Sequence, residues 1–266
     1  MGLLEKSEGK YYCPDEVASA LSKESETSIL SMVRLSLGGW KRWSDLTDIV
    51  RHGKDKIKGP VFDISEIEQE AFFSAMHAIA YMMAPGIVAA TKPGKAKKLL
   101  DIGGGSGSYT QAFLEASPSL TATIFDLPPV IKNAQNRLAT SGLLDRINFI
   151  AGDFYKDELP PGHDLALLSA IIHQNSPEKN IELYRKIFRA LPPGGRLVIR
   201  DHVMNSDHTQ PTSGAFFAVN MLVVTAEGRT YSFEEIRSSL ESAGFIKVNL
   251  IQPDEQMNGL VEGFKP

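Results

Sequence analysis

The segment LLDIGGGSGSYT, residues 99–110, decides the fold of this chain. An apolar, strand-like run ends at Asp101, four glycines follow within residues 103–107, and a helical pattern begins behind them. Glycines allow the backbone to turn sharply and to approach a ligand closely. The first turn of the following helix favours a negative group. The strand and the helix on either side strengthen the prediction of a cofactor site at this turn.

The next predicted strand ends at Asp126, where a carboxylate can accept hydrogen bonds from ribose hydroxyls. We therefore expect a nucleoside site, for which a nicotinamide dinucleotide and S-adenosylmethionine are both candidates. The spacing of Gly103, Gly105 and Gly107 lacks the G-x-G-x-x-G fingerprint of dinucleotide sites. Asp101 would repel a pyrophosphate but attract a cationic methionine group. Both features favour S-adenosylmethionine.

A third predicted strand is followed by Gly152, Asp153 and Phe154. The Asp153 carboxylate can accept a hydrogen bond from an adenine amino group, and the Phe154 ring can pack against the base. The alternative interpretation of Asp153 is a turn-forming residue.

Outward from this segment, strand and helix patterns alternate. The predicted strands are 97–103, 120–126, 147–152, 164–170 and 196–203, and the predicted helices are 107–116, 128–140, 177–191, 213–224 and 232–243. This alternation predicts a doubly wound α/β fold with a mostly parallel sheet. Two further strands, 245–251 and 259–265, are too close together for a helix between them, so we expect an antiparallel C-terminal hairpin.

The chain before residue 95 predicts a helical N-terminal extension. Residues 1–25 are expected to form a short hairpin or loop with its turn at 7–9, followed by polar turn residues. Residues 27–52 predict one or two helices broken at Gly38 and Gly39, before a charged linker at 54–60. An apolar helix is expected over 64–84, with Pro85 and Gly86 interrupting it.

Composition excludes several classes of protein. The 266 residues carry a net charge of −4 without a basic run, which argues against nucleic-acid binding. A single cysteine, Cys13, permits no internal disulfide and favours a reducing cytoplasm. The most apolar window, 71–90, contains His77, Pro85 and Gly86, so we expect no membrane span. The first ten residues do not form a signal peptide.

In combination, the motifs DIGGGSG, FDLP, GDF, LSAIIH and ALPPGGRL resemble the class I S-adenosylmethionine-dependent methyltransferases. They are most similar to the small-molecule O-methyltransferase family that includes the caffeic-acid and hydroxyindole enzymes. The resemblance implies a Rossmann-like methyltransferase fold with a seven-stranded sheet. It also implies S-adenosylmethionine as cofactor, S-adenosylhomocysteine as product, and cofactor contacts from Asp101, Gly103, Gly105, Asp126, Leu127, Asp153, Phe154 and Ser169.

His173 follows the fourth predicted strand, so it points toward the place where a methyl acceptor should lie. At the matching family position a histidine acts as general base on the acceptor hydroxyl. A phenol has a pKa of about 10, so a positioned base is needed at neutral pH. Asp201, which ends the fifth strand, is the expected acid that orients the imidazole. The alternative interpretations are a polar helix-entrance residue for His173 and a strand-end hydrogen-bonding residue for Asp201.

Two departures from the family pattern stand near this histidine. Gln174 and Asn175 replace an Asp-Trp pair whose tryptophan frames the adenine in many relatives. Thr230 stands where relatives carry a second acid. These differences leave open a C- or N-methyltransferase, another reaction with the same cofactor, or a cofactor-binding module without turnover.

The resemblance implies an acceptor pocket between the helices predicted at 64–84 and 213–224, lined by Phe72, Met76, Asn220 and Met221. Plain core packing is the alternative for the apolar members. His77, on the first of these helices, is a further candidate for polar lining. The remaining histidines and the single cysteine show no metal-ligand spacing, so we expect no metal site.

Relatives carry a winged-helix-like dimerisation region before the catalytic part, and residues 2–12 resemble only its wing. We therefore expect residues 1–60 to be a partial dimerisation-type region with a linker, and residues 61–266 to be the S-adenosylmethionine-binding domain. A homodimer is expected for a full-length form. The expected activity is methyl transfer to a hydroxyl, phenolic in nature, of a small aromatic or polyketide-like molecule.

Overall fold

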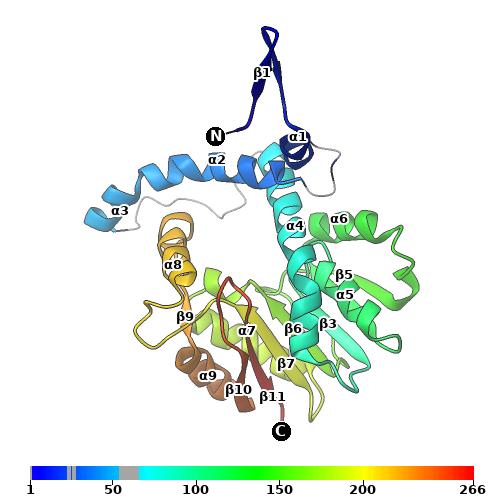
Figure 1. The fold of residues 1–266 in the computed structure, drawn as a ribbon. Helices are drawn as coiled ribbons and strands as arrows, with labels where there is room; N and C mark the ends of the chain where they lie inside the picture. Colours follow the sequence, from blue (N-terminus) through cyan, green and yellow to red (C-terminus); the bar gives the residue numbers. More distant parts are fainter. Residues whose placement is uncertain (1, 23–24, 26–27, 54–65) are drawn as a thin grey trace.

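The computed structural model describes residues 2–22, 25, 28–53 and 66–266 (Figure 1). The predicted linker at 54–60 and the proposed boundary at residue 60 lie outside this range. The rest of the chain forms one large sheet with helices on both faces, a helical layer above it and a small hairpin that projects from the top (Figure 1).

Seven strands form the sheet in the order β10-β11-β7-β6-β3-β4-β5. The parallel strands are β3 (Lys98–Ile102), β4 (Thr121–Asp126), β5 (Ile147–Ala151), β6 (Leu165–Ser169) and β7 (Arg196–Asp201). The hairpin of β10 (Ile246–Gln252) and β11 (Gly259–Phe264) adds antiparallel to β7. The predicted fold class is therefore confirmed.

Helices cover both faces of this sheet because alternate side chains of each strand point to opposite sides. One core joins the sheet to α7 (Pro177–Ala190) and α9 (Phe233–Ser242). The other joins it to α4 (Glu66–Thr91), α5 (Ser108–Ala116) and α6 (Pro128–Leu138). Short 3₁₀ turns, η1 (Leu144–Arg146) and η2 (Ile172–Gln174), precede β5 and α7.

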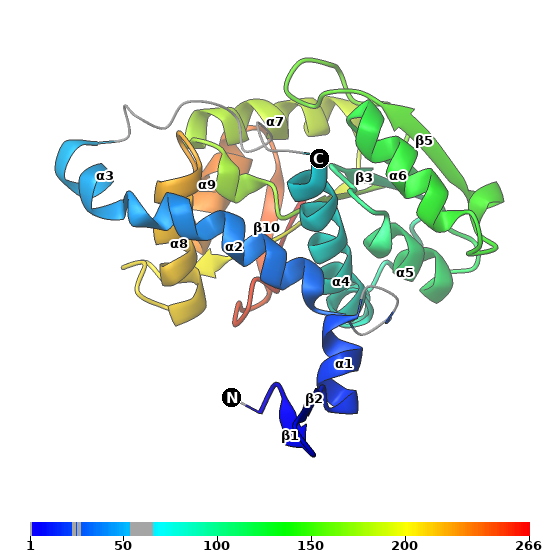
Figure 2. The same ribbon diagram turned by 90° about the horizontal axis from the view of Figure 1, so that it is seen from above.

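The N-terminal part begins with the predicted hairpin, β1 (Glu5–Ser7) and β2 (Lys10–Tyr12). Helix α1 (Asp15–Leu21) follows where polar turn residues were expected, so that expectation was wrong. Helix α2 (Leu30–Ser44) packs against both α4 and α8 (Thr212–Val224) and leads into α3 (Leu46–His52). Figure 2 shows α2 spanning from α8 to α4 above the sheet.

Two predicted helix breaks are absent. Helix α2 continues through Gly38 and Gly39 and ends at Ser44, because packing against α4 outweighs the low helix propensity of glycine. Helix α4 continues through Pro85 and Gly86. Both residues lie on its exposed side, where water can satisfy the carbonyl that the proline leaves unpaired, while Ala84, Ile87 and Val88 are buried.

One further feature was not predicted, and the apolar window identified in the sequence lies within one continuous helix. A short parallel pair, β8 (Val203–Met204) and β9 (Tyr231–Ser232), joins the end of β7 to the start of α9. Within α4, residues Phe72–Thr91 are long and apolar enough to cross a membrane by length and composition, although a core helix passes the same test.

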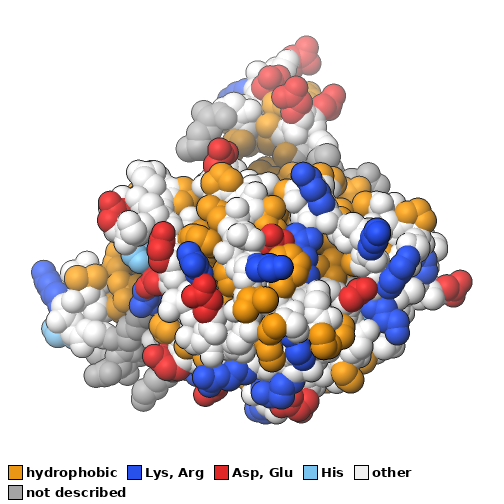
Figure 3. All heavy atoms as spheres, turned by 90° about the horizontal axis from the view of Figure 1, so that it is seen from below, with side chains coloured by type: hydrophobic (Ala, Val, Ile, Leu, Met, Phe, Trp, Pro, Cys, Tyr) orange, Lys and Arg blue, Asp and Glu red, His pale blue; other side chains and the backbone are white. Residues whose placement is uncertain are grey.

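On the face shown in Figure 3, basic and acidic side chains are interspersed.

Candidate functional site

The predicted site residues gather at one edge of the sheet, because parallel strands bring their carboxyl ends together. Gly103 follows β3, Asp126 ends β4, Ser169 ends β6 and Asp201 ends β7. His173 lies in η2, four residues after Ser169, where β6 ends. Helices α2 and α8 lie above this edge (Figure 1).

The glycine turn is fixed by its own backbone. Gly103 has a φ of +65°, and a Cβ there would lie 2.8 Å from Ile171 Cδ1. Gly105 has a φ of +57°, and a Cβ there would meet nothing within 4 Å, so the turn is open on that side. The structure therefore places a close-packed glycine beside one that leaves space for a ligand.

Asp126 ties this turn to the neighbouring strand. Its Oδ2 accepts a 2.9 Å hydrogen bond from the Gly105 N–H, and its Oδ1 accepts a 2.7 Å bond from the Leu127 N–H. Burial raises the pKa of Asp126, and these two bonds act in the opposite direction. Each carboxylate oxygen retains a lone pair that could accept a ribose hydroxyl.

Asp101 is fully enclosed behind the turn. Only 1% of its surface is exposed, and its Oδ2 accepts a 2.7 Å hydrogen bond from the Thr110 hydroxyl. Burial, reinforced by the nearby Asp126 carboxylate, raises its pKa to about 6, while the Thr110 hydroxyl lowers it. A cation brought close to Asp101 would favour its ionised form.

Asp153 and Phe154 lie beside the turn, on the loop after β5. The Phe154 ring faces Gly103, since a Cβ on Gly103 would lie 3.3 Å from Phe154 Cε1. Asp153 accepts a 2.9 Å bond from the Tyr155 N–H and pairs with Lys156 at 3.1 Å. Burial acts to raise the pKa of Asp153, but these partners lower it overall. Asp153 thus has the turn-forming contacts of the alternative interpretation.

His173 and Asp201 form a hydrogen-bonded pair. The imidazole Nδ1 lies 2.9 Å from Asp201 Oδ1 and 3.0 Å from Oδ2, and the Asp201 side chain is 1% exposed. Burial alone would raise the pKa of Asp201, but the charge and hydrogen bond of His173 hold that pKa below its ordinary value. An ionised Asp201 selects the tautomer that carries its proton on Nδ1, leaving Nε2 as a proton acceptor.

Backbone contacts that the sequence did not predict hold the turn around His173. The His173 carbonyl accepts a 2.8 Å bond from the Arg229 N–H, and the Ile172 carbonyl accepts a 3.0 Å bond from Asn180 Nδ2. A Cβ on Gly228 would lie 2.6 Å from the His173 carbonyl oxygen. No periodicity signals these contacts, because the partners belong to separate loops and helices.

The departures at 174–175 and 230 have a structural counterpart. Asn175 is 1% exposed, and its side-chain Nδ2 donates a hydrogen bond to Asn180 Oδ1. Its side-chain Oδ1 accepts a hydrogen bond from the Tyr155 hydroxyl, and its backbone carbonyl accepts one from the Tyr231 hydroxyl. Thr230 is also buried. The nearby acid Glu227 forms an ion pair with Lys179 at 2.8 Å and not with His173.

A second histidine–aspartate pair lies close to the first. His202 Nδ1 is 2.6 Å from Asp254 Oδ2, and both side chains are buried. The Phe217 ring of α8 lies between the pairs, with its centroid 4.9 Å from that of His173 and 4.9 Å from that of His202. Sequence reasoning missed Asp254, which is separated from His202 by 52 positions.

The predicted acceptor-side residues are spread over α4 and α8. Asn220 Oδ1 accepts a 3.1 Å bond from Trp43 Nε1 of α2, and Met221 is buried. Phe72 packs edge-on against Phe73, and Met76 is half-buried on the same helix. His77 Nδ1 lies 2.8 Å from the Ser108 hydroxyl at the start of α5, so it contacts the glycine turn; burial and Arg137 lower its pKa.

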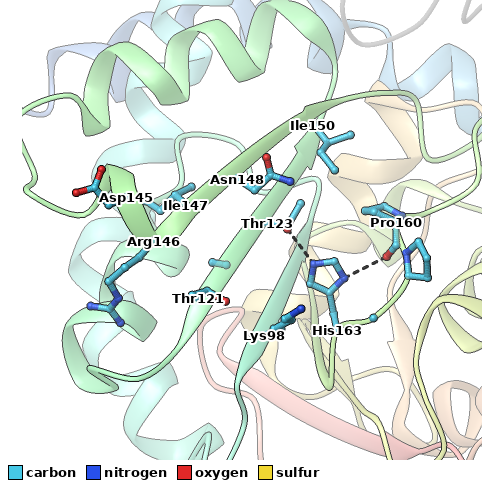
Figure 4. Close-up of a pocket in the computed structure, with 13 residues that line it drawn as sticks. Lys98, Thr121, Thr123, Asp145, Arg146, Ile147, Asn148, Ile150, Pro160 and His163 are labelled. Atoms are coloured by element: carbon cyan, nitrogen blue, oxygen red, sulfur yellow. Dashed lines mark hydrogen bonds between the residues drawn. The ribbon is translucent and has the colours of Figure 1, made fainter.

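Other parts of the described chain offer less chemistry. Among the described residues, no group of three or more His, Cys, Asp or Glu side chains could hold a metal. A hollow of about 440 Å³ lies at the amino ends of β3, β4 and β5, at the opposite edge of the sheet (Figure 4). There His163 bonds the Thr123 hydroxyl at 2.8 Å and the Pro160 carbonyl at 3.1 Å, which is a structural role.

Comparisons with known proteins agree with this geometry. Residues 43–246 match the family model described as an O-methyltransferase domain. A 3-hydroxy-5-methyl-1-naphthoate 3-O-methyltransferase of Streptomyces sahachiroi is 30% identical over 274 residues, covering 100% of this chain and 78% of the relative. An L-tyrosine C(3)-methyltransferase of Streptomyces lavendulae is 33% identical over 178 residues, covering 66% of this chain and 49% of the relative.

The solved structures give the same result. The crystal structure of human N-acetylserotonin methyltransferase in complex with S-adenosylmethionine superposes with a TM-score of 0.85 at 26% identity. The match covers 99% of this chain and 79% of the human one.

Proposed function

The chain belongs to the O-methyltransferase domain family, and from this premise we propose that it methylates a hydroxyl of a small aromatic or polyketide-like molecule, with His173 as general base. The cofactor is S-adenosylmethionine. The observation that carries the proposal is the His173–Asp201 pair, in which a buried carboxylate holds Nδ1 and leaves Nε2 available at the carboxyl end of β6.

The residues around the glycine turn fit the cofactor. Gly105 leaves open space, Asp101 offers a buried acid to a cationic group, and Asp126 has spare lone pairs for ribose hydroxyls. We propose that the cofactor is held by Asp101, Gly103, Gly105, Asp126, Leu127, Asp153, Phe154 and Ser169. When bound, S-adenosylmethionine supplies an electrophilic methyl group.

The chain's own contribution to the reaction is alignment and proton removal. His173 Nε2 takes the proton of the acceptor hydroxyl while that oxygen receives the methyl group, whose bond to the cofactor sulfur would break to leave S-adenosylhomocysteine. Asp201, ionised and buried, stabilises the imidazolium and keeps the ring oriented. A phenol is ionised in only about one molecule in a thousand at pH 7, which explains the need for this base.

We propose that Phe72, Met76, Asn220 and Met221 line the acceptor pocket. The Trp43–Asn220 hydrogen bond supports this arrangement, because it ties α2 to α8, whose Phe217 ring contacts His173. We also propose the division into a dimerisation-type region, 1–60, and a methyltransferase domain, 61–266, with a homodimer in full-length form. The exposed thiol of Cys13, which forms no disulfide, supports a cytoplasmic enzyme.

The experiment that tests the base compares His173→Ala with the exposed-residue control His52→Ala. Methyl transfer is measured as S-adenosylhomocysteine release over a panel of phenols, and calorimetry measures S-adenosylhomocysteine binding. We expect His173→Ala to lose about 10²- to 10⁴-fold in kcat with cofactor affinity unchanged. A loss of less than tenfold for His173→Ala would overturn the assignment of the base.

A second candidate function is methylation of a ring carbon. It is favoured by Thr230, which replaces the second family acid, and by the similarity to an L-tyrosine C(3)-methyltransferase. The same phenol panel distinguishes the two, since the methyl resonance of an aryl methyl ether differs from that of a ring methyl in the NMR spectrum of the product. Cofactor binding without any product would instead indicate a non-catalytic module.

A further inference from the structure

Three unpaired polar atoms gather in one buried compartment. Among the described residues, Tyr109 Oη, Ser169 Oγ and Arg200 Nε are buried without a hydrogen-bond partner. Arg200 is 4% exposed and Tyr109 is 7% exposed. Buried polar groups are nearly always paired, so an unpaired cluster at a sheet edge indicates a place for a ligand group.

The three side chains adjoin each other. Ser169 and Arg200 are paired in register at the ends of β6 and β7, and the guanidinium carbon of Arg200 lies 5.6 Å from the Tyr109 ring centroid. Burial raises the pKa of Tyr109, while the nearby Arg200 charge and Ser169 hydroxyl act to lower it, although the Tyr109 and Ser169 hydroxyls form no hydrogen bond of ordinary geometry. Helix α4 closes the compartment, because Met83 Sδ lies 3.2 Å from an Arg200 terminal nitrogen.

Arg200 carries a buried charge that its described partners do not neutralise. Its contacts are a thioether and an aromatic face, and its described contacts include no ion pair. The Arg200 charge helps to lower the pKa of Asp201, but the Asp201 carboxylate is hydrogen-bonded to His173 and not to Arg200. A buried guanidinium is costly unless an anion accepts its hydrogen bonds in planar geometry, for which a carboxylate is well suited.

Asp101 lies on the same face of the sheet as this compartment. Asp101 is level with Leu167 of β6, and Ser169 follows Leu167 on the same side of that strand. This end of the sheet thus presents the Asp101 carboxylate on β3 and the Arg200 guanidinium on β7, with the Ser169 hydroxyl on the strand between them and the Tyr109 hydroxyl from α5. This arrangement complements the zwitterionic end of an α-amino acid.

We propose that Arg200, with the hydroxyls of Tyr109 and Ser169, binds the carboxylate of the methionine part of S-adenosylmethionine. The inference rests on the proposed cofactor site and assigns residues to it. Asp101 then lies on the side of the ammonium group. Arg200 is a binding residue in this role and takes no part in proton removal.

The test is calorimetry with a matched pair of ligands. Decarboxylated S-adenosylmethionine keeps the sulfonium and the ammonium but lacks the carboxylate. We expect the wild-type chain to bind S-adenosylmethionine about 10- to 100-fold more tightly than the decarboxylated compound, and Arg200→Met to remove that difference. The control Arg196→Met, at the other end of β7, should keep it, because Arg196 pairs with Glu262.

The two ligands also separate the possible failures. The role of Arg200 would be overturned if the wild type bound both compounds with equal affinity. It would also be overturned if Arg200→Met lost the same factor of affinity for both compounds. Absence of binding by either compound to the wild type would instead refute the proposed cofactor site. If Arg200→Met does not fold, Tyr109→Phe decides: it should weaken only S-adenosylmethionine, by a few fold, and an equal effect on both ligands contradicts the proposal.

Discussion

Asp101 is buried at a cost to the folded chain. Its pKa rises from 3.8 to about 6, mainly because of burial, so the folded state binds the proton more tightly than the unfolded chain does. The contribution of Asp101 to the free energy of unfolding is therefore greatest below about pH 4, and it falls as the pH rises to about 6. A residue that weakens the fold at neutral pH while facing the cofactor turn fits a binding role.

Substituting Asp101→Asn tests this interpretation, because Asn can still accept the Thr110 hydrogen bond but cannot ionise. We expect the variant without cofactor to exceed the wild type in free energy of unfolding by about 1 to 3 kcal/mol at pH 7.5. Urea unfolding at pH 7.5 and pH 4.5 measures the difference, which should shrink at the lower pH. The exposed control Asp145→Asn should show no such change, and a pH-independent difference for Asp101→Asn would contradict the argument.

Individual residues were predictable from sequence where they follow a strand directly. Asp101, Asp126 and Asp201 each end a strand, so the topology alone brings them to one edge. Asp254 and Arg200 were not predictable in their roles. The partner of Asp254 is 52 positions away, and the neighbours of Arg200 belong to α4 and α5, so only the folded chain brings them together.

Elements were predicted well wherever buried periodicity was strong. The strands of the sheet have nearly continuous buried runs, and Ser176 caps α7 as its sequence indicates. Helix ends inside the N-terminal layer were predicted wrongly because glycine and proline were taken as breaks. In α2 and α4, packing between the two helices decides the length, and local propensity is the weaker effect.

The loop at Gly228 gives an element-scale prediction. A Cβ there would lie 2.4 Å from Thr225 Oγ1 and 2.6 Å from the His173 carbonyl oxygen, so η2 must shift. We expect Gly228→Ala to destabilise the chain by about 1 to 3 kcal/mol and to lower kcat with unchanged S-adenosylhomocysteine affinity. Gly39→Ala, in open space within α2, is the control and should stabilise by up to about 1 kcal/mol. Unchanged kcat in Gly228→Ala would show that the loop does not position His173.

At the scale of the whole molecule, apolar side chains remain exposed on the helical layer. Leu37 is 71% exposed, Trp40 79% and Val50 68% on α2 and α3, while Met82 of α4 is 74% exposed and Phe216 of α8 is 68% exposed. Helices α2, α3 and α8 lie above the carboxyl edge of the sheet, and α4 runs from this layer down one face of the sheet (Figures 1 and 2). Exposed apolar surface of this kind is typical of an interface between subunits.

This layer also gives a prediction for the present chain, beyond the homodimer proposed for a full-length form. We expect sedimentation velocity to show a dimer for the wild type at micromolar concentration, and Trp40→Ser to shift it toward monomer by removing the most exposed of these side chains. Leu144→Ser, which changes an apolar side chain that is 40% exposed on η1, should leave the dimer intact. If the wild type sediments as a monomer at every concentration, the layer is not a self-association surface. If Trp40→Ser also lowers kcat, the interface helps to hold α2 over the acceptor side, because Trp43 of the same helix is bonded to Asn220.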